Sequence, residues 1–167
     1  FGYLGGRVSR ALLEAGYPVV CSSRQPERSS AATFPGMQCV AVDWSSSESL
    51  LKACSGIECL VHLAAMNELQ SAQDPVGALN FNGVASLRLL EAAIAAGVKR
   101  FIFFSTAHVY GAPLQGSISE TTLARRGVRL LALPANLLDA CWHDRPPAQA
   151  RPALLLDDEF TGRSSLA

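Results

Sequence analysis

The segment Phe101–Gly111, FIFFSTAHVYG, constrains the fold more than any other part of the chain. It begins as an apolar run that is typical of a buried strand. It then ends abruptly in polar side chains, first Ser105 and Thr106, then His108 and Tyr110. Open α/β sheets bind their ligands in the crevice outside the carboxyl ends of the strands. A buried strand that ends in hydroxyl groups therefore predicts such a sheet, with a functional site at this edge.

Three further apolar runs share the character of this strand, because none of them alternates apolar and polar residues. With it they give four expected strands, at Pro18–Ser22, Gln38–Val42, Cys59–Leu63 and Arg100–Ser105. Between and before them, apolar residues at helical spacing predict helices at Gly2–Ala15, Ser46–Ala53 and Asp74–Gly97. Strands without alternation are covered on both faces, so the order of elements predicts an α/β fold: a Rossmann-like, doubly wound parallel sheet.

The ends of the expected helices carry appropriate residues. Gly16 follows the first helix as a C-terminal cap, and Ser45 or Ser46 is expected to cap the second. The expected elements give one domain over residues 1–122, and Arg129–Leu133, within residues 123–139, could add a further strand to the same sheet. Residues 140–167 contain three closely spaced prolines and are expected to form an irregular tail, apart from a short apolar contact through Leu154–Leu156.

Composition excludes several classes of function. The chain of 167 residues has 14 basic and 14 acidic side chains, so its net charge offers no electrostatic basis for binding nucleic acid or an anionic membrane. No apolar run approaches the roughly 20 residues that span a bilayer. The five cysteines form no C-x-x-C pair, which favours a reduced, cytoplasmic protein over one with disulfides or a metal site. No metal ligands are assigned.

Four positions are candidates for holding a dinucleotide at the start of the first helix: Gly2, Tyr3, Leu4 and Gly5. A dinucleotide fingerprint needs a strand and three glycines, for the tight turn, the approach of the pyrophosphate and helix packing. Gly2 and Gly5 would be the second and third, and the first glycine and the first strand would lie before Phe1. The alternative is a glycine-rich helix start without a ligand.

Other candidates follow the next two strands. Arg24 lies where such folds recognise the adenosine ribose, and the absence of a carboxylate there slightly favours NADP over NAD. Asp43 and Trp44 end the following strand, where a carboxylate accepts from the adenine amino group. A solvated loop arginine and a helix-capping aspartate are the respective alternatives.

After the third strand come His62, Leu63, Ala64 and Ala65. The small residues allow the chain to pass close to a bound cofactor, whereas His62 is interpreted as a core histidine rather than a catalyst. Ser105 and Thr106 are candidates for binding a substrate hydroxyl or carbonyl, with strand-end capping as the alternative.

In order along the chain, these segments resemble the extended short-chain dehydrogenase/reductases, the NAD(P)-dependent epimerase/dehydratase group that acts mainly on nucleotide sugars. GYLGG is similar to the end of the T-G-x-x-G-x-x-G loop, and LVHLAA to V-x-H-L-A-A. NGVASLRLLEAA, from Asn82, resembles N-V-x-G-T-x-x-L-L-E-A-A, with Ala85 and Ser86 in place of the Gly-Thr pair. GVKRFIFFSTAHVYG is close to G-V-K-R-F-V-x-x-S-S-x-x-V-Y-G.

This resemblance implies that residues 1–122 form a partial NAD(P)-binding domain, and it implies roles by position. Thr106, with Ser105 beside it, would be the catalytic residue that hydrogen-bonds the reacting oxygen. Asn82 would hold its helix and a water relay. Gly2 and Gly5 would contact the pyrophosphate, and the backbone at Ala64 and Ala65 would run close to the cofactor. The implied partners are a nicotinamide dinucleotide, NAD or NADP, and a sugar-nucleotide-like substrate, and the parent enzyme is expected to be a homodimer.

The sequence departs from the family where a helix with Tyr-x-x-x-Lys is expected. The only tyrosines are Tyr3, Tyr17 and Tyr110, and no lysine stands four residues after any of them. GVRLLALPAN, from Gly127, resembles a later strand of the family, so the chain passes from Thr122 to that strand without the catalytic helix. We therefore expect an incomplete sheet, with the first strand and one helix missing, in a protein inactive by the family mechanism. A dinucleotide-binding module without chemistry and a non-functional fragment of a longer enzyme remain the alternatives.

Overall fold

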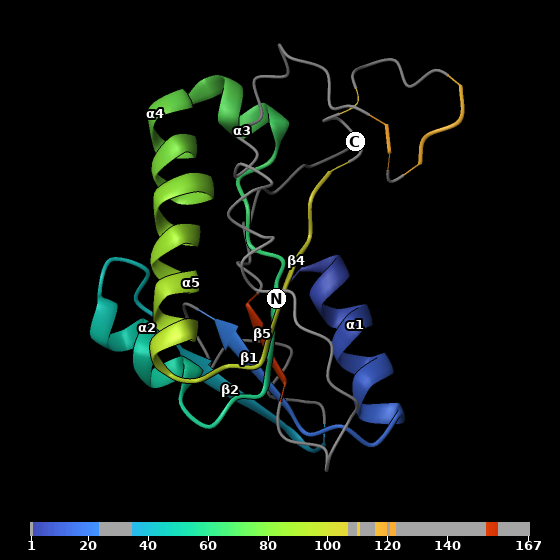
Figure 1. Cartoon of the computed structure of the whole chain (residues 1–167), viewed down its shortest axis with the longest axis vertical. Coiled ribbons are helices and arrows are strands. Elements are labelled where there is room, and N and C mark those ends of the chain that lie inside the picture. The colour runs from blue at the N-terminus through green and yellow to red at the C-terminus, as the bar shows by residue number, and fades with distance from the viewer. Residues whose placement is uncertain are drawn as a thin grey trace, which may run out of the picture.

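A parallel β-sheet forms the centre of the protein in the computed structural model, which describes residues 2–23, 35–106, 110, 116–119, 121–122 and 153–156. Its strands are β1 (Val19–Ser23), β2 (Met37–Ala41), β3 (Cys59–His62), β4 (Arg100–Phe103) and β5 (Ala153–Leu156). They are ordered β2-β1-β5-β3-β4, and every neighbouring pair is parallel (Figure 1). The predicted doubly wound α/β architecture is confirmed, and the first four strands lie within two residues of their expected positions.

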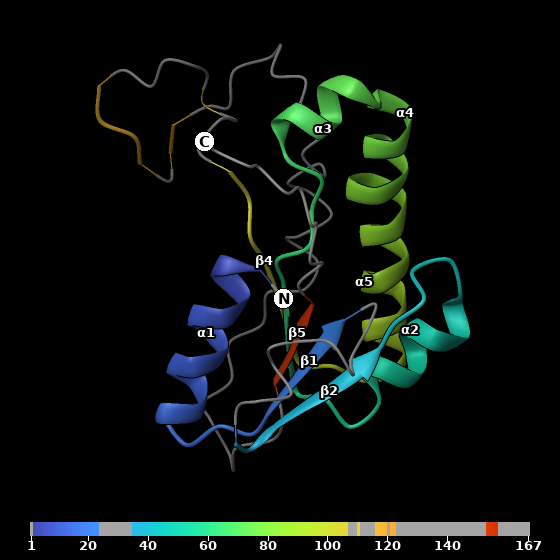
Figure 2. The same cartoon turned by 180° about the vertical axis from the view of Figure 1, so that it is seen from behind.

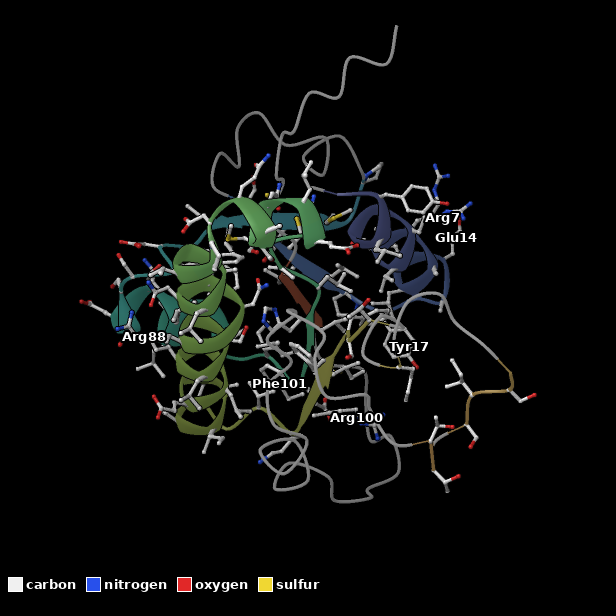
Figure 3. All side chains as sticks on the ribbon, turned by 90° about the horizontal axis from the view of Figure 1, so that it is seen from above. Arg7, Glu14, Tyr17, Arg88, Arg100 and Phe101 are labelled. Carbon is white, nitrogen blue, oxygen red and sulfur yellow. The ribbon has the colours of Figure 1, made fainter. Side chains whose placement is uncertain are left out.

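Helices cover both faces of this sheet. On one face lies α1 (Tyr3–Glu14), and on the other lie α2 (Ser47–Cys54) and α5 (Ser86–Ala95), as the two opposite views show (Figures 1 and 2). Seen from above, Arg7 and Glu14 project from the outer side of α1, away from the sheet (Figure 3). The chain is therefore a three-layer sandwich, which explains why the strands are apolar on both faces.

The central strand is the main departure from the sequence-based expectation. β5 comes from the segment that we expected to be an irregular tail, and that expectation is wrong for Ala153–Leu156. The apolar run Leu154–Leu156 pairs with β1 on one side and β3 on the other. Consequently the sheet has no gap at its centre. The suggested strand at residues 129–133, the rest of 123–139 and Arg24 lie outside the described residues.

Helix ends follow the predicted capping. Gly16 has φ of 83°, a left-handed conformation that glycine adopts without the steric penalty of a β-carbon, and it ends α1. Of the two candidate caps for α2, Ser46 is the one used, because its Oγ accepts a hydrogen bond from the backbone N–H of Ser49 at 3.2 Å.

The long helix expected from Asp74 is interrupted. It consists of α4 (Pro75–Ala78), the π-helix η3 (Leu79–Ala85) and α5. A short helix before it, α3 (Glu68–Gln73), was not predicted. A capping box of Asn67 and Gln70 starts α3, and this pair was a signal that the sequence offered. The π-helical turn places one extra residue in the helix, a feature often found at functional sites.

Two apolar clusters hold the layers together. One joins α2, α5 and β3 through residues such as Leu50, Leu60 and Leu89, and the other packs α1 against Val19 and Val61. Leu89 and Ala93 of α5 are buried against α2, whereas Ile94 of the same helix is 64% exposed.

The cysteines in the described residues are unpaired thiols. Cys21 and Cys54 are fully buried, and burial raises the pKa of Cys21 to about 12 and that of Cys54 to about 11. Such thiols are protonated at neutral pH and act as small apolar side chains. None of the helices in the described part of the chain is long and apolar enough to cross a membrane.

Candidate functional site

The carboxyl ends of all the strands meet at one edge of the sheet, and most of the predicted site residues lie there. Asp43 and Trp44 follow β2, Leu63 to Ala65 follow β3, and Ser105 and Thr106 follow β4. The helix α1 runs antiparallel to the strands, so its N-terminus with Gly2 reaches the same edge (Figure 1). Residues from separate segments are thus assembled at the position where doubly wound folds bind ligands.

The N-terminus of α1 offers backbone groups rather than side chains. Gly2 is the N-cap with extended φ and ψ, and Gly5 is buried against the rest of the domain. The side chains of Tyr3 and Leu4 are 75% and 52% exposed, and the guanidinium of Arg7 lies 5.1 Å from the centre of the Tyr3 ring. An anion at this end would therefore meet the first backbone amides of the helix and the positive end of its dipole, with no β-carbon on Gly2 or Gly5.

Asp43 has a structural role of its own. Its Oδ1 accepts hydrogen bonds from the Oγ of Ser45 at 2.6 Å and from the backbone N–H of Ser45 at 2.9 Å, which makes a turn before α2. These bonds lower the pKa of the Asp43 carboxyl below its usual value, and the bond from the Ser45 hydroxyl has the larger effect. Asp43 is therefore a fixed, exposed anion at the edge of the sheet. It supports the turn but does not itself cap the helix, because Ser46 does.

His62 is a buried core histidine, as interpreted from the sequence, but it has a specific partner. Its Nε2 lies 2.7 Å from the Oγ of Ser86 on α5, and only 1% of the residue is exposed. The rings of Trp44, Phe101 and Phe103 lie within 6.1 Å of its ring centre. Burial lowers the pKa of His62 to about 4, so the imidazole is neutral at physiological pH and unsuited to proton transfer there.

Asn82, in the π-helix η3, binds the loop that follows β3. Its Oδ1 accepts from the backbone N–H of Met66 at 2.7 Å, and its Nδ2 donates to the carbonyl oxygen of the same residue at 3.2 Å. The Oγ of Ser71 donates to that carbonyl as well, at 3.3 Å. Sequence reasoning missed Met66, because nothing in a single sequence indicates that a backbone group will be bound sixteen residues away. Asn82 thus positions the Ala64–Ala65 loop.

Replacing Asn82 by alanine is expected to release this loop and to lower the free energy of unfolding by about 1–3 kcal/mol, because the Met66 N–H loses its acceptor and the Met66 carbonyl keeps only the Ser71 donor. Asn82→Asp is the matched comparison, since it keeps an acceptor for the Met66 N–H but cannot donate to the Met66 carbonyl. Hydrogen exchange at Met66 and urea titration would measure both effects. Equal exchange rates in the wild type and Asn82→Ala would contradict this assignment.

The two hydroxyl residues after β4 differ in their surroundings. Ser105 is exposed and Thr106 is half-buried, and the strand is held to its neighbour by a hydrogen bond from the Phe104 N–H to the His62 carbonyl at 3.0 Å. Thr106 is thus the better placed of the two to contact a ligand while remaining fixed.

Both lysines of the chain lie away from this edge. Lys99 stands immediately before β4, at the amino end of that strand, where its N–H donates to the carbonyl of Glu58. Lys52 is in the last turn of α2, which leads to the amino end of β3. Neither can reach the neighbourhood of Thr106. Within the described residues, no group of three His, Cys, Asp or Glu side chains is placed to hold a metal ion.

Comparison with known proteins gives one consistent family. Residues 1–127 match the NAD dependent epimerase/dehydratase family. The UDP-glucose 4-epimerase of Lacticaseibacillus casei is 32% identical over 123 residues, which is 72% of this chain and 37% of that protein. The chain spans less than half the length of the curated relatives it matches.

Solved structures agree with this. MoeE5 in complex with UDP-glucose and NAD is 29% identical, with a TM-score of 0.67 over 94% of this chain and 50% of that one. DesIV, a dTDP-glucose 4,6-dehydratase from Streptomyces venezuelae with NAD bound, is 25% identical, with a TM-score of 0.65 over 77% of this chain and 44% of that one. Both structures contain NAD, so they give no support to the slight preference for NADP that we based on Arg24.

Proposed function

Because this chain belongs to the NAD-dependent epimerase/dehydratase family, the extended short-chain dehydrogenase/reductases, we propose that it is an NAD-binding domain that lacks the family's proton-transfer step. The observation that carries the proposal is the contrast at the carboxyl edge of the sheet. The backbone features suited to a dinucleotide are present there, whereas both lysines lie at the opposite edge.

The residues at the edge fit a dinucleotide. The pyrophosphate would rest against the N-terminus of α1, where Gly2 and Gly5 present backbone amides without a β-carbon. The small residues Ala64 and Ala65, held by the Asn82–Met66 hydrogen bonds, would let the chain pass beside the cofactor. Asp43 would accept a hydrogen bond from the adenine amino group through the carboxylate oxygen that does not bind Ser45.

When bound, the nicotinamide of NAD is a hydride acceptor, and the rest of the chemistry depends on the protein. Thr106 can donate a hydrogen bond to a substrate oxygen and orient it. The sequence resemblance implies that in this family a tyrosine acts as the acid and base that exchanges a proton with the substrate. A neighbouring lysine lowers the pKa of that tyrosine. A phenol with its ordinary pKa near 10 is a poor base at neutral pH, and no lysine lies near the edge to lower it. We therefore expect binding without turnover.

Calorimetry with NAD, followed by an assay for interconversion of UDP-glucose and UDP-galactose, tests the proposal. We expect heat of binding with NAD, weaker binding of NADP, and no sugar conversion at any enzyme concentration. Conversion of the sugar nucleotide would refute the non-catalytic part of the proposal. A protein that is folded by circular dichroism and yet binds neither dinucleotide would refute the binding part.

A substitution at Gly2 should separate binding from stability. Gly2→Asp is expected to weaken NAD binding about tenfold or more, because its carboxylate stands where the pyrophosphate would lie. The same carboxylate should stabilise α1 by about 0.5–1 kcal/mol, since aspartate is a better N-cap than glycine and favours the helix dipole. Calorimetry and thermal denaturation measure the two effects. Gly2→Ala is the comparison: its β-carbon adds bulk without charge, so it should weaken NAD binding less than Gly2→Asp does, and it should not stabilise α1 because alanine is a poorer N-cap than glycine.

A second candidate function is catalysis by this chain as a sugar-nucleotide epimerase. The observation that favours it is the position of Thr106, together with the similarity to a UDP-glucose 4-epimerase, to MoeE5 with UDP-glucose bound and to a dTDP-glucose 4,6-dehydratase. The UDP-galactose assay decides between the two functions, because only this second candidate predicts turnover.

A further inference from the structure

Two cysteines lie side by side on neighbouring strands of the sheet. Cys21 of β1 and Cys39 of β2 are register partners in a parallel pair, so their side chains leave the sheet on the same face (Figure 2). Neighbouring strands are about 4.8 Å apart, and a disulfide joins Cα atoms that are roughly 4.4–6.8 Å apart. The backbone spacing of this pair therefore suits a disulfide, although both residues are free thiols in the structure.

The side chain of Cys21 leans towards β2. Its Sγ donates a hydrogen bond to the carbonyl oxygen of Gln38, the residue before Cys39, at 3.3 Å. The two thiols form one cluster with Met37. Burial is the main reason that the pKa of Cys21 rises to about 12, and the nearby Cys39 thiol adds to the rise. Register, side-chain direction and contact therefore agree in placing the two sulfur atoms together.

The two thiols differ in their access to solvent. Cys21 is fully buried, whereas Cys39 is half-buried on β2, which is an edge strand of the sheet in the described residues. An oxidant from solution therefore reaches Cys39 first. A buried, protonated thiol is inert towards the solution, but Cys21 is held beside Cys39 and so meets an oxidised Cys39 at a high effective concentration.

We propose that Cys21 and Cys39 form a thiol-oxidation site, at which a peroxide converts the pair reversibly into a disulfide between β1 and β2. The sulfur of Cys39 attacks the peroxide and the O–O bond breaks. Cys39 becomes a sulfenic acid, and its thiol proton leaves with the alcohol or water that is released. The sulfur of Cys21 then attacks that of Cys39. The S–S bond forms, the S–O bond breaks, and the hydroxyl leaves as water with the proton of Cys21. The electrons and protons lost by the two thiols are those that the peroxide takes up.

Cys59 is the matched comparison within the same chain. It is half-buried on β3, as Cys39 is on β2, and it packs against Val19, which lies on the same face of β1 as Cys21. Its register partners, Arg100 of β4 and Ala153 of β5, are not cysteines. Cys39 and Cys59 are thus similarly accessible, but only Cys39 has a thiol as its register partner. We therefore expect a disulfide at Cys39 and none at Cys59.

Peptide mapping of the intact, reduced chain after treatment with hydrogen peroxide tests the proposal. Trypsin cleaves after Arg24 and Arg28, so a disulfide between Cys21 and Cys39 joins two separate peptides, 11–24 and 29–52. Thiols that remain free are alkylated before digestion. We expect this linked pair to be about tenfold more abundant than any other cysteine pair, to occur in monomeric protein and to disappear on reduction with dithiothreitol.

Two variants separate contact between the thiols from simple reactivity. In Cys21→Ala, Cys39 keeps its access to peroxide but loses its partner. Its sulfenic acid should therefore persist, and dimedone should label it severalfold more than in the wild type. Cys59→Ser should leave the abundance of the disulfide between Cys21 and Cys39 unchanged.

Three outcomes would overturn the proposal. One is wild-type protein that keeps its circular dichroism spectrum in peroxide and forms no disulfide between Cys21 and Cys39. Another is equal dimedone labelling of Cys39 in the wild type and in Cys21→Ala, which would mean that Cys21 does not react with it. The third is linkage of Cys39 mainly to a second molecule. The wild-type map needs no variant to fold, and its readout is covalent linkage and not NAD binding, so it remains decisive if the proposed function fails.

Discussion

Replacing Leu155 by proline is expected to abolish cooperative folding of this protein. Proline has no N–H, so one ladder hydrogen bond to β1 or β3 is lost, and its ring is excluded from central strands. The carbonyl left without a donor costs about 1–3 kcal/mol by itself. In the described residues, β5 alone joins the β1–β2 pair to the β3–β4 pair. Its displacement therefore leaves one edge of β1 and one edge of β3 without hydrogen-bond partners. Typical domains have only about 5–15 kcal/mol of total stability.

The comparison variant is Leu155→Val, which keeps the N–H and has a high preference for strands. Thermal unfolding followed by far-ultraviolet circular dichroism should give a sharp transition for Leu155→Val and a broad or absent one for Leu155→Pro. Hydrogen exchange should show lost protection at Val19–Ser22 and at Cys59–His62, the residues that pair with β5. A Leu155→Pro protein with the melting temperature of the wild type would show that β5 does not support the sheet.

Sequence periodicity was sufficient for the part of the fold in which neighbours along the chain become neighbours in space. The four expected strands are apolar without alternation, and the helices between them end at Gly16 or start at Ser46 as predicted. These signals are local: a buried strand must be apolar, a helix end needs its cap, and both constraints are visible within a few residues.

β5 could not be predicted in the same way. Four apolar residues beside Pro152 are equally compatible with a loop contact, and nothing near them in the sequence identifies β1 or β3 as partners. Pairing between segments this far apart in the sequence is a property of the whole topology. The unpredicted helix α3 is a different case, because its Asn67/Gln70 capping box was a local signal.

The sequence predicted at which edge of the sheet the candidate site residues lie, but not which residues they contact there. That Asp43, Ala64, Ala65 and Thr106 would gather at one edge follows from the parallel order of the strands. The contacts that fix the edge join residues far apart in sequence, such as Asn82 with Met66 and His62 with Ser86. Both pairs connect the segment around β3 to the long helix, so the helix holds the loop that would border a cofactor.

The second large effect should be a loss of stability in acid that depends on His62. The imidazole is buried among aromatic rings, with its pKa lowered to about 4, whereas in the unfolded chain the pKa is near 6.5. Below the higher value the unfolded state binds a proton that the native state does not, so the free energy of unfolding falls as the pH falls. The loss begins near pH 6.5, has a slope of up to about 1.4 kcal/mol per pH unit, and levels off near pH 4, at about 3 kcal/mol in total.

Urea titration between about pH 7.5 and about pH 3.5, a range that brackets both pKa values, measures this curve, and His62→Gln provides the comparison. Glutamine does not titrate, and its amide can still hydrogen-bond to the Oγ of Ser86, so the variant should have lower stability at neutral pH but a much flatter dependence on pH. Asp43, whose pKa is lowered by Ser45, contributes its own acid-dependent loss of stability at lower pH in both proteins, and this loss cancels when the two curves are subtracted.

Among the described residues, the native state has no group that would stabilise a protonated His62. Its Nδ1 has no hydrogen-bond partner in this part of the chain, so a proton added to it would find no acceptor. Parallel curves for the two proteins would mean that the pKa of His62 is the same in the native and the unfolded state, and that water reaches the imidazole between β3 and α5.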